Sequence, residues 1–99
     1  MFSGDESRLI SVEIRGEVAH PRHYSLPSGP GVSDAVRQAG GFTERDLQRG
    51  IVVHRFGGVN HGGKTFEVDF RKVRKDWRYD LILQDGDKIY VPTGDFGIR

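Results

Sequence analysis

The chain contains no cysteine among its 99 residues, so disulfides, thiol catalysis and cysteine-based metal sites are excluded. It also lacks long apolar runs. No stretch approaches the about 20 apolar residues of a membrane-spanning helix, and residues 1–8 lack the apolar core of a signal peptide. Charge of one sign is not in excess, because 15 basic and 14 acidic side chains leave a formal net charge of +1. No overall field therefore attracts nucleic acid or an anionic membrane, and an electrostatic partner must meet a local patch.

What the chain does contain is enough apolar material for one folded domain. Hydrophobic residues make up 35% of it, and with so small a net charge this composition is typical of a chain that folds. A single modest core is expected at this length. We expect a flexible segment at residues 1–8, one domain over residues 9–92, and a linker to a further module at residues 93–99.

The stretch from Val32 to Gly41 carries the signals of a short helix. Ser33 is the expected N-cap, and Asp34 suits the positive end of the helix dipole. Gly40 and Gly41 end the helix, because glycine enters the left-handed conformation without a steric penalty. A helix this short must pack against something larger. Its apolar residues recur at spacings of three and four and share one face: Val32, Ala35, Val36 and Ala39.

Strand patterns lie on both sides of this helix. From Ile10 to Val18 apolar and polar residues alternate, which predicts a strand with one face on a core. Gly16 takes an inward position there and leaves room for a bulge or a close neighbour. Glu13 and Glu17 are expected to point outward, as solvent-exposed partners of neighbouring strands. Further strands are expected at residues 23–26, 51–55, 64–70 and 88–92.

Two strands, one helix and further short strands make a mixed α+β pattern, in which a single helix can cover only one face of a sheet. This pattern describes a β-grasp, or ubiquitin-like roll, with a mixed sheet of about four to five strands packed on one main helix. The turn before the last strand contains Asp85, Gly86 and Asp87. Asp and Gly stabilise such tight turns locally.

Several stretches in this order resemble the soluble-ligand-binding β-grasp (SLBB) family. They are residues 12–18 with Gly16, Pro21 with Tyr24, residues 32–41 with their Ala-Gly-Gly ending, and residues 83–92 with Gln-Asp-Gly-Asp. The resemblance covers roughly residues 9–92. Members often carry Pro-Gly in the first hairpin, and Arg22 stands here in place of that glycine. We therefore expect a different turn type, with Arg22 and His23 displayed at its tip.

By that resemblance, the commonest setting of such a module is the periplasmic part of an outer-membrane polysaccharide export protein, where copies are stacked in a ring-shaped oligomer. The resemblance implies a non-catalytic binding and assembly module with a periplasmic location. Its expected partners are other copies or modules of the same export protein, the inner-membrane co-polymerase and the polysaccharide. No cofactor and no membrane insertion by this segment are expected.

A basic and aromatic stretch is the candidate for glycan contact, because aromatic faces stack on sugar rings and Arg or Lys pairs with acidic sugars. Its residues are Arg71, Lys72, Arg74, Lys75, Trp77, Arg78 and Tyr79. The composition favours a plainer interpretation, a solvated surface whose Trp77 and Tyr79 rings pack onto the edge of the core.

Other chemistry is weakly indicated. The histidines lie on a predicted turn and strands without a ligand spacing, and no carboxylate or cysteine completes a set, so no metal site is expected: His20, His23, His54 and His61. No nucleophile motif points to catalysis. The alternative function is a nucleic-acid-binding module, since β-grasp domains of this family also occur in DNA-uptake receptors and residues 71–78 could track phosphates. The near-zero net charge argues against it, so nucleic acid is not an expected partner.

Overall fold

The computed structural model describes residues 9–27, 29–43, 50–56 and 63–92. Its strands are β1 (Leu9–Gly16), β2 (Arg22–Pro27), β3 (Ile51–Arg55), β4 (Lys64–Val68) and β5 (Lys88–Val91). Its helical segments are α1 (Val32–Gln38), α2 (Phe70–Lys75) and the 3-10 helix η3 (Trp77–Tyr79). Within the described ranges, no helix has both the length and the apolar character that crossing a membrane requires.

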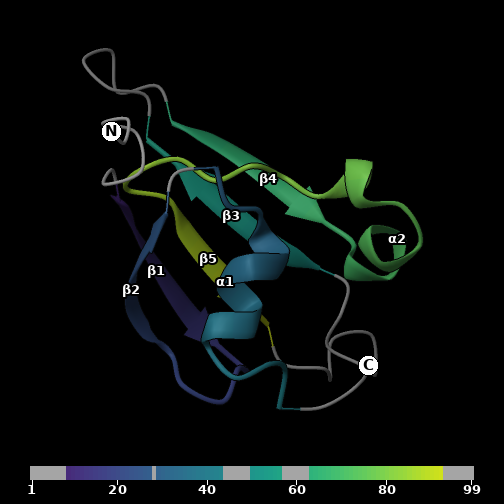
Figure 1. Ribbon diagram of the computed structural model, residues 1–99, viewed down its shortest axis with the longest axis horizontal. Coiled ribbons are helices and arrows are strands. Elements are labelled where there is room, and N and C mark those ends of the chain that lie inside the picture. The colour runs from purple at the N-terminus through teal and green to yellow at the C-terminus, as the bar shows by residue number, and fades with distance from the viewer. Residues whose placement is uncertain (1–8, 28, 44–49, 57–62, 93–99) are drawn as a thin grey trace, which may run out of the picture.

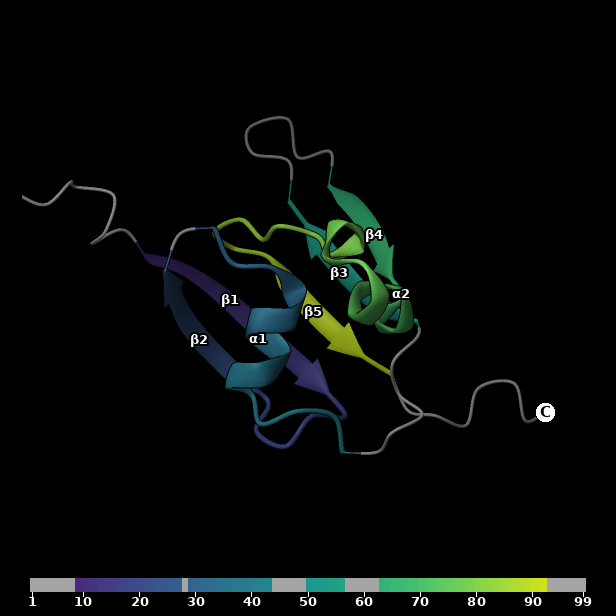
Figure 2. The same ribbon diagram turned by 45° about the vertical axis from the view of Figure 1, so that its right-hand side comes forward.

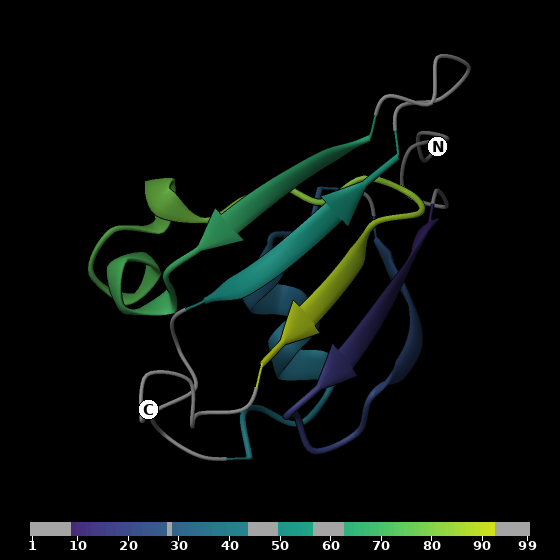
Figure 3. The same ribbon diagram turned by 180° about the vertical axis from the view of Figure 1, so that it is seen from behind.

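The five strands form one mixed sheet in the order β2-β1-β5-β3-β4. β1 and β5 pair in parallel at the centre, and the other neighbours pair antiparallel. The helix α1 lies across one face of this sheet (Figure 1), and Figure 3 shows the opposite face, on which none of the described helices packs. The predicted α+β architecture, a β-grasp-type sheet on one main helix, is confirmed.

The core lies between α1 and the sheet, and alternation along the strands supplies its sheet side. Val12 and Ile14 of β1, and Ile89 and Val91 of β5, are each at most 1% exposed. The predicted apolar face of α1 is confirmed, since its four members are at most 3% exposed: Val32, Ala35, Val36 and Ala39. Burying one Val or Ile side chain stabilises the fold by about 1.5–3 kcal/mol relative to leaving it exposed. This burial holds a helix of seven residues in place.

The two ends of α1 differ in how well the sequence predicts them. At the carboxyl end, the Gly41 N–H donates to the carbonyl of Val36, and the Gly40 N–H to that of Arg37. Gly40 has a φ of +89°, so the predicted glycine stop is confirmed as a left-handed closure. At the amino end the predicted cap is wrong, because Gly31 is the N-cap and Ser33 lies inside the first turn.

Gly16 allows a close approach between the two central strands. Its φ is +98°, and a Cβ placed there would collide with the carbonyl oxygen of Val91. The predicted close neighbour is therefore confirmed, and it is the backbone of β5. On the other face of β1, Glu13 is only 8% exposed, so the expectation of a solvent-exposed carboxylate is wrong. The cause is the set of side chains that surround its carboxylate, which are Arg15, His23 and Lys88.

The turn after β1 does not display Arg22 and His23 at its tip, as the sequence predicts. Both residues belong to β2, where Arg22 pairs with Ile14 and His23 pairs with Glu13. The strand thus begins at Arg22, one residue before the predicted strand over residues 23–26. Both side chains are exposed, but they lie along an edge strand.

The turn before β5 has the predicted chemistry and an additional role. Asp87 accepts a hydrogen bond from the Gln84 N–H at 2.8 Å, as turn chemistry requires. Its side chain is 1% exposed and also accepts both Nε (3.0 Å) and Nη2 (2.8 Å) of Arg55. Hydrogen bonding to Asp87 raises the pKa of Arg55 above its usual value. Asp85 accepts from the Ser11 N–H at 2.7 Å, so each carboxylate fastens the turn to a different strand.

Candidate ligand-binding groove

The basic stretch begins where β4 ends. The predicted strand over residues 64–70 is too long, because β4 stops at Val68 and Phe70 opens α2. Asp69 explains the change, since its carboxylate accepts from the Arg71 N–H at 3.0 Å and caps the new helix. The same carboxylate binds the Arg71 guanidinium through Nε at 2.9 Å and Nη2 at 2.7 Å. This hydrogen bonding lowers the pKa of Asp69 to about 2.

The same arrangement recurs one helix later. Asp76 caps η3 by accepting from the Arg78 N–H, and it binds Nε and Nη2 of Arg78, all at 3.0 Å. The hydrogen bond from Arg78 lowers the pKa of Asp76. Arg71 and Arg78 are therefore each paired with the carboxylate two residues before them. Their charges stabilise local turns.

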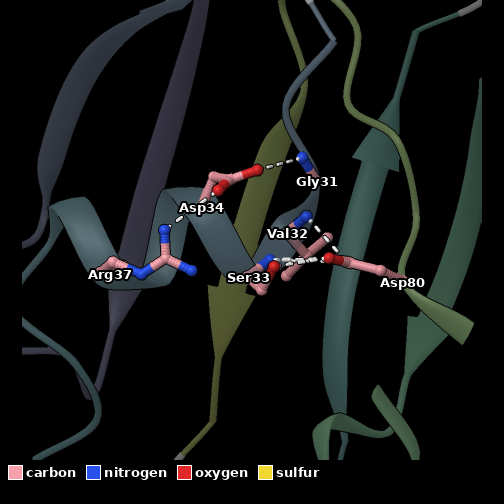
Figure 4. A network of polar contacts seen from close by, with 6 residues as sticks. All are labelled: Gly31, Val32, Ser33, Asp34, Arg37 and Asp80. Carbon is pink, nitrogen blue, oxygen red and sulfur yellow. Dashed lines mark hydrogen bonds and ion pairs between the residues drawn. The ribbon is translucent and has the colours of Figure 1, made fainter. Parts of the chain in front are cut away.

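Asp80 joins this segment to α1 (Figure 4). One carboxylate accepts from the backbone N–H of Val32 at 2.9 Å, from the Ser33 N–H at 3.3 Å and from Ser33 Oγ at 2.6 Å. Asp80 thus performs the capping that the sequence analysis assigns to Ser33. On the adjacent side, Asp34 accepts from the Gly31 N–H at 2.9 Å and pairs with Arg37 Nη1 at 3.1 Å.

A hollow of about 610 Å³ lies between these two helical regions, which we call the α1–α2 groove. Figure 2 shows the α1 and α2 ribbons in one view, and the groove is lined by residues of both helices. Its apolar lining contains Phe42 and Phe70, whose rings meet edge to face at 5.1 Å. The volume falls within the about 300–1,000 Å³ that is usual for small-molecule sites. The lining residues are Ser33, Val36, Arg37, Gly41, Phe42, Thr43, Phe70, Val73, Arg74, Trp77 and Asp80.

The seven predicted contact residues do not act as one set. Arg74 and Trp77 line the groove, whereas Arg71 and Arg78 are held by their carboxylates. Lys72 lies over the Tyr79 ring, with Nζ 5.7 Å from the centroid, and Lys75 is exposed at the end of α2.

The plainer interpretation of this stretch is wrong in one respect. Trp77 is 77% exposed and Tyr79 is 58% exposed, so neither ring packs down onto the core. The residue of the stretch that does enter the core is Val73, which is 9% exposed. The indole therefore stands beside the groove with most of its surface accessible.

Three residues line the groove that the sequence pattern does not indicate: Phe42, Phe70 and Asp80. Phe42 follows the glycine stop of α1 and forms an isolated bridge with Val18. The alternating pattern predicts a strand at Phe70, which instead begins α2. No local signal identifies Asp80 as the cap of α1, because its partners lie 47 and 48 residues away.

A second hollow of about 620 Å³ lies on the other side of α1, between its carboxyl half and the end of β2. It contains no aromatic side chain, and its lining is Leu26, Pro27, Gly29, Pro30, Asp34, Arg37 and Gln38. Across the described part of the chain, no group of three or more His, Asp or Glu is placed to hold a metal ion. His61 lies outside the described residues. The α1–α2 groove is therefore the better candidate for an organic ligand.

A mixed sheet on one helix, with an aromatic groove beside that helix, defines the class as a small β-grasp binding module. The SLBB domain model matches residues 11–69, which is more than half of the chain. The chain belongs to the SLBB domain family, a family of soluble-ligand-binding modules, as the sequence predicts. No curated protein matches the chain. The family match spans β1 to β4 and reaches α1, Phe42 and Asp69, and the remaining groove residues follow it in the chain.

Proposed function

We propose that this chain is a non-catalytic binding and assembly module of a bacterial polysaccharide export protein, located in the periplasm. In this role it contacts neighbouring copies or modules of the export protein and the inner-membrane co-polymerase, and it binds the sugar chain in the α1–α2 groove. Membership of the SLBB family and the usual setting of that family support the export role.

The observation that carries glycan binding is the exposed indole of Trp77 at the edge of an apolar, aromatic-lined groove. Ligand sites combine an apolar lining with a few polar groups that fix orientation. Here those groups are Ser33, Asp80 and two guanidinium groups, which together can donate to and accept from sugar hydroxyls.

The sheet supports the assembly part of the proposal. Among the described strands, β2 and β4 each have a neighbour on one side only, and an edge strand can pair with another chain. Tyr90 alternates with the buried Ile89 and Val91 of β5, so it lies on the face opposite α1, where it is 48% exposed. None of the residues of β2 or β4 lines the groove, and neither does Tyr90.

An NMR titration of the labelled chain tests the proposal. Neutral and acidic oligosaccharides, and a short DNA duplex at physiological salt, are added in separate series. Sugar-induced shifts confined to the residues that line the groove support glycan binding. Trp77→Ala should weaken these shifts, whereas Tyr90→Ala, which removes an exposed aromatic ring on the opposite face, should not. Shifts at residues 71–78 with DNA alone would instead favour a nucleic-acid-binding module.

A further inference from the structure

The charges around the α1–α2 groove are not all available to a ligand. Two of the five cations between residues 71 and 78 are held by neighbouring carboxylates, Arg71 by Asp69 and Arg78 by Asp76. Each pair is bidentate and includes the capping hydrogen bond of a helix. Releasing either guanidinium would therefore also leave a helix cap without its positive partner.

Inside the groove, the charges of Arg37 and Asp80 are each balanced by a partner. Arg37 pairs with Asp34 on the same helix at 3.1 Å. The negative charge of Asp80 is met by two backbone N–H groups and one hydroxyl at the positive end of α1 (Figure 4). Neither group therefore determines which charge a ligand in the groove should carry.

Arg74 is different. It lines the groove, it is exposed, and no ion pair joins it to a carboxylate of the described residues. It lies three residues before Trp77, which lines the same groove. An arginine fork binds a carboxylate through two parallel hydrogen bonds. A ring stacked on the indole could thus present a carboxylate to this guanidinium.

We propose that the α1–α2 groove selects carbohydrates that carry a carboxylate, and that Arg74 is the residue that binds it. This inference rests on the proposed glycan-binding function and specifies the class of sugar. Lys72 and Lys75 add positive charge on the same short helix, and no carboxylate of the described residues pairs with them. The exposed surface of α2 therefore favours an anionic sugar over a neutral one.

The test uses the whole chain and two probes that differ only in charge, α-1,4-linked trigalacturonic acid and its full methyl ester. Affinities are measured by calorimetry, and the binding site is mapped by NMR. The acid should bind more tightly than the ester. Raising the salt concentration should weaken binding of the acid and leave binding of the ester unchanged. Arg74→Gln should weaken acid binding roughly tenfold or more, which is the loss expected for a hydrogen bond to a charged group.

Arg22→Gln is the control, because it removes the same charge from an exposed side chain of the edge strand β2 that does not line the groove. It should leave the affinity for the acid within about twofold. Equal affinities for acid and ester, or equal losses in the two variants, would overturn the role of Arg74 while glycan binding in the groove stands. Absence of groove shifts with both probes would overturn the glycan proposal as well. Tighter groove binding of a DNA duplex than of the acid would assign Arg74 to phosphate contact and overturn the inference.

Discussion

The carboxylate of Asp80 accepts a hydrogen bond at 2.9 Å from the backbone N–H of Val32, which lies 48 residues earlier in the chain. Gly31, at the N-cap of α1, has no side chain that could accept this bond. The backbone reinforces the connection, because the Val32 N–H also reaches the Leu81 carbonyl at 3.1 Å and the Leu83 N–H donates to Pro30. The amino end of α1 and the segment after η3 therefore form one wall of the groove.

Removing this carboxylate should destabilise the fold. Asp80→Ala leaves the first N–H groups of α1 without their side-chain acceptor, and a lost cap costs about 0.5–2 kcal/mol in the free energy of unfolding. Asp80→Asn keeps an acceptor oxygen and should lose less. Urea unfolding of both variants measures the difference. An alanine variant as stable as the wild type would show that backbone bonds alone hold this end of α1.

The sequence predicts the elements whose causes are local. The apolar spacing of α1, its glycine stop and the alternation of β1 each depend on residues within one or two turns. The cap of α1 is not predictable in this way, because Ser33 satisfies the local rule while a more distant carboxylate is brought to the same N–H groups by the tertiary fold. The predicted exposure of Glu13 is wrong for the same reason, because its burial depends on Lys88 and His23 from neighbouring strands.

The Arg55–Asp87 ion pair should be the most costly one to break. Asp87 is 1% exposed and Arg55 is 17% exposed, so Asp87→Ala leaves a largely buried guanidinium without its partner. Such a loss is worth about 3 kcal/mol in the free energy of unfolding. Arg55→Met combined with Asp87→Ala removes the stranded charge and should recover part of the loss in a double-mutant cycle. Additive effects of the two single variants would contradict this coupling.

Gly16 should not tolerate a side chain. In Gly16→Ala the alanine must adopt the positive φ of this position, which costs about 1–2 kcal/mol in the free energy of unfolding. Its Cβ would also collide with the Val91 carbonyl at the centre of the sheet. Gly86→Ala is the control, because Gly86 has a similar φ of +91° with no atom within 4 Å of the added Cβ. Thermal unfolding should therefore show a larger loss at Gly16 than at Gly86. Equal losses would mean that β1 and β5 can separate without cost.

The Asp69–Arg71 pair should survive moderate acid. The pKa of Asp69 in the folded state is about 2, below the usual 3.8. The pair therefore stabilises the folded state above pH 3.8, and this contribution disappears as the pH falls toward 2. The ¹³C shift of the Asp69 carboxyl group, followed from pH 6 to pH 1.5, measures the midpoint. Arg71→Gln should move the midpoint upward, toward 3.8. Lys75→Gln, which removes a cation from the same helix without touching Asp69, should leave it unchanged.

The candidate site was predictable only in composition. The sequence locates a basic and aromatic stretch, but it does not distinguish Arg74 from Arg71 and Arg78. That distinction depends on which guanidinium lies two residues after a capping aspartate. It therefore depends on the position at which the strand stops and α2 begins. The sequence pattern also allows Phe70 to extend the strand, so it predicts the wrong element for this lining residue of the groove.

Trp77 should contribute to binding and hardly at all to stability. Its ring is 77% exposed, so Trp77→Ala should change the free energy of unfolding by no more than about 0.5 kcal/mol. Phe70→Ala is the contrasting variant, because Phe70 packs against the core and Phe42, and it should lose about 2–3 kcal/mol, somewhat less than a fully buried Phe. Urea unfolding compares the two.

The same residue provides the readout for ligands, because Trp77 is the only tryptophan of the chain. In the free protein its fluorescence should be solvent-like and strongly quenched by acrylamide. A ligand that stacks on the indole in the α1–α2 groove removes water from the ring, so the emission should shift to shorter wavelength and the quenching should fall. If trigalacturonic acid binds without either change, it does so away from Trp77, and the ring cannot be part of the site.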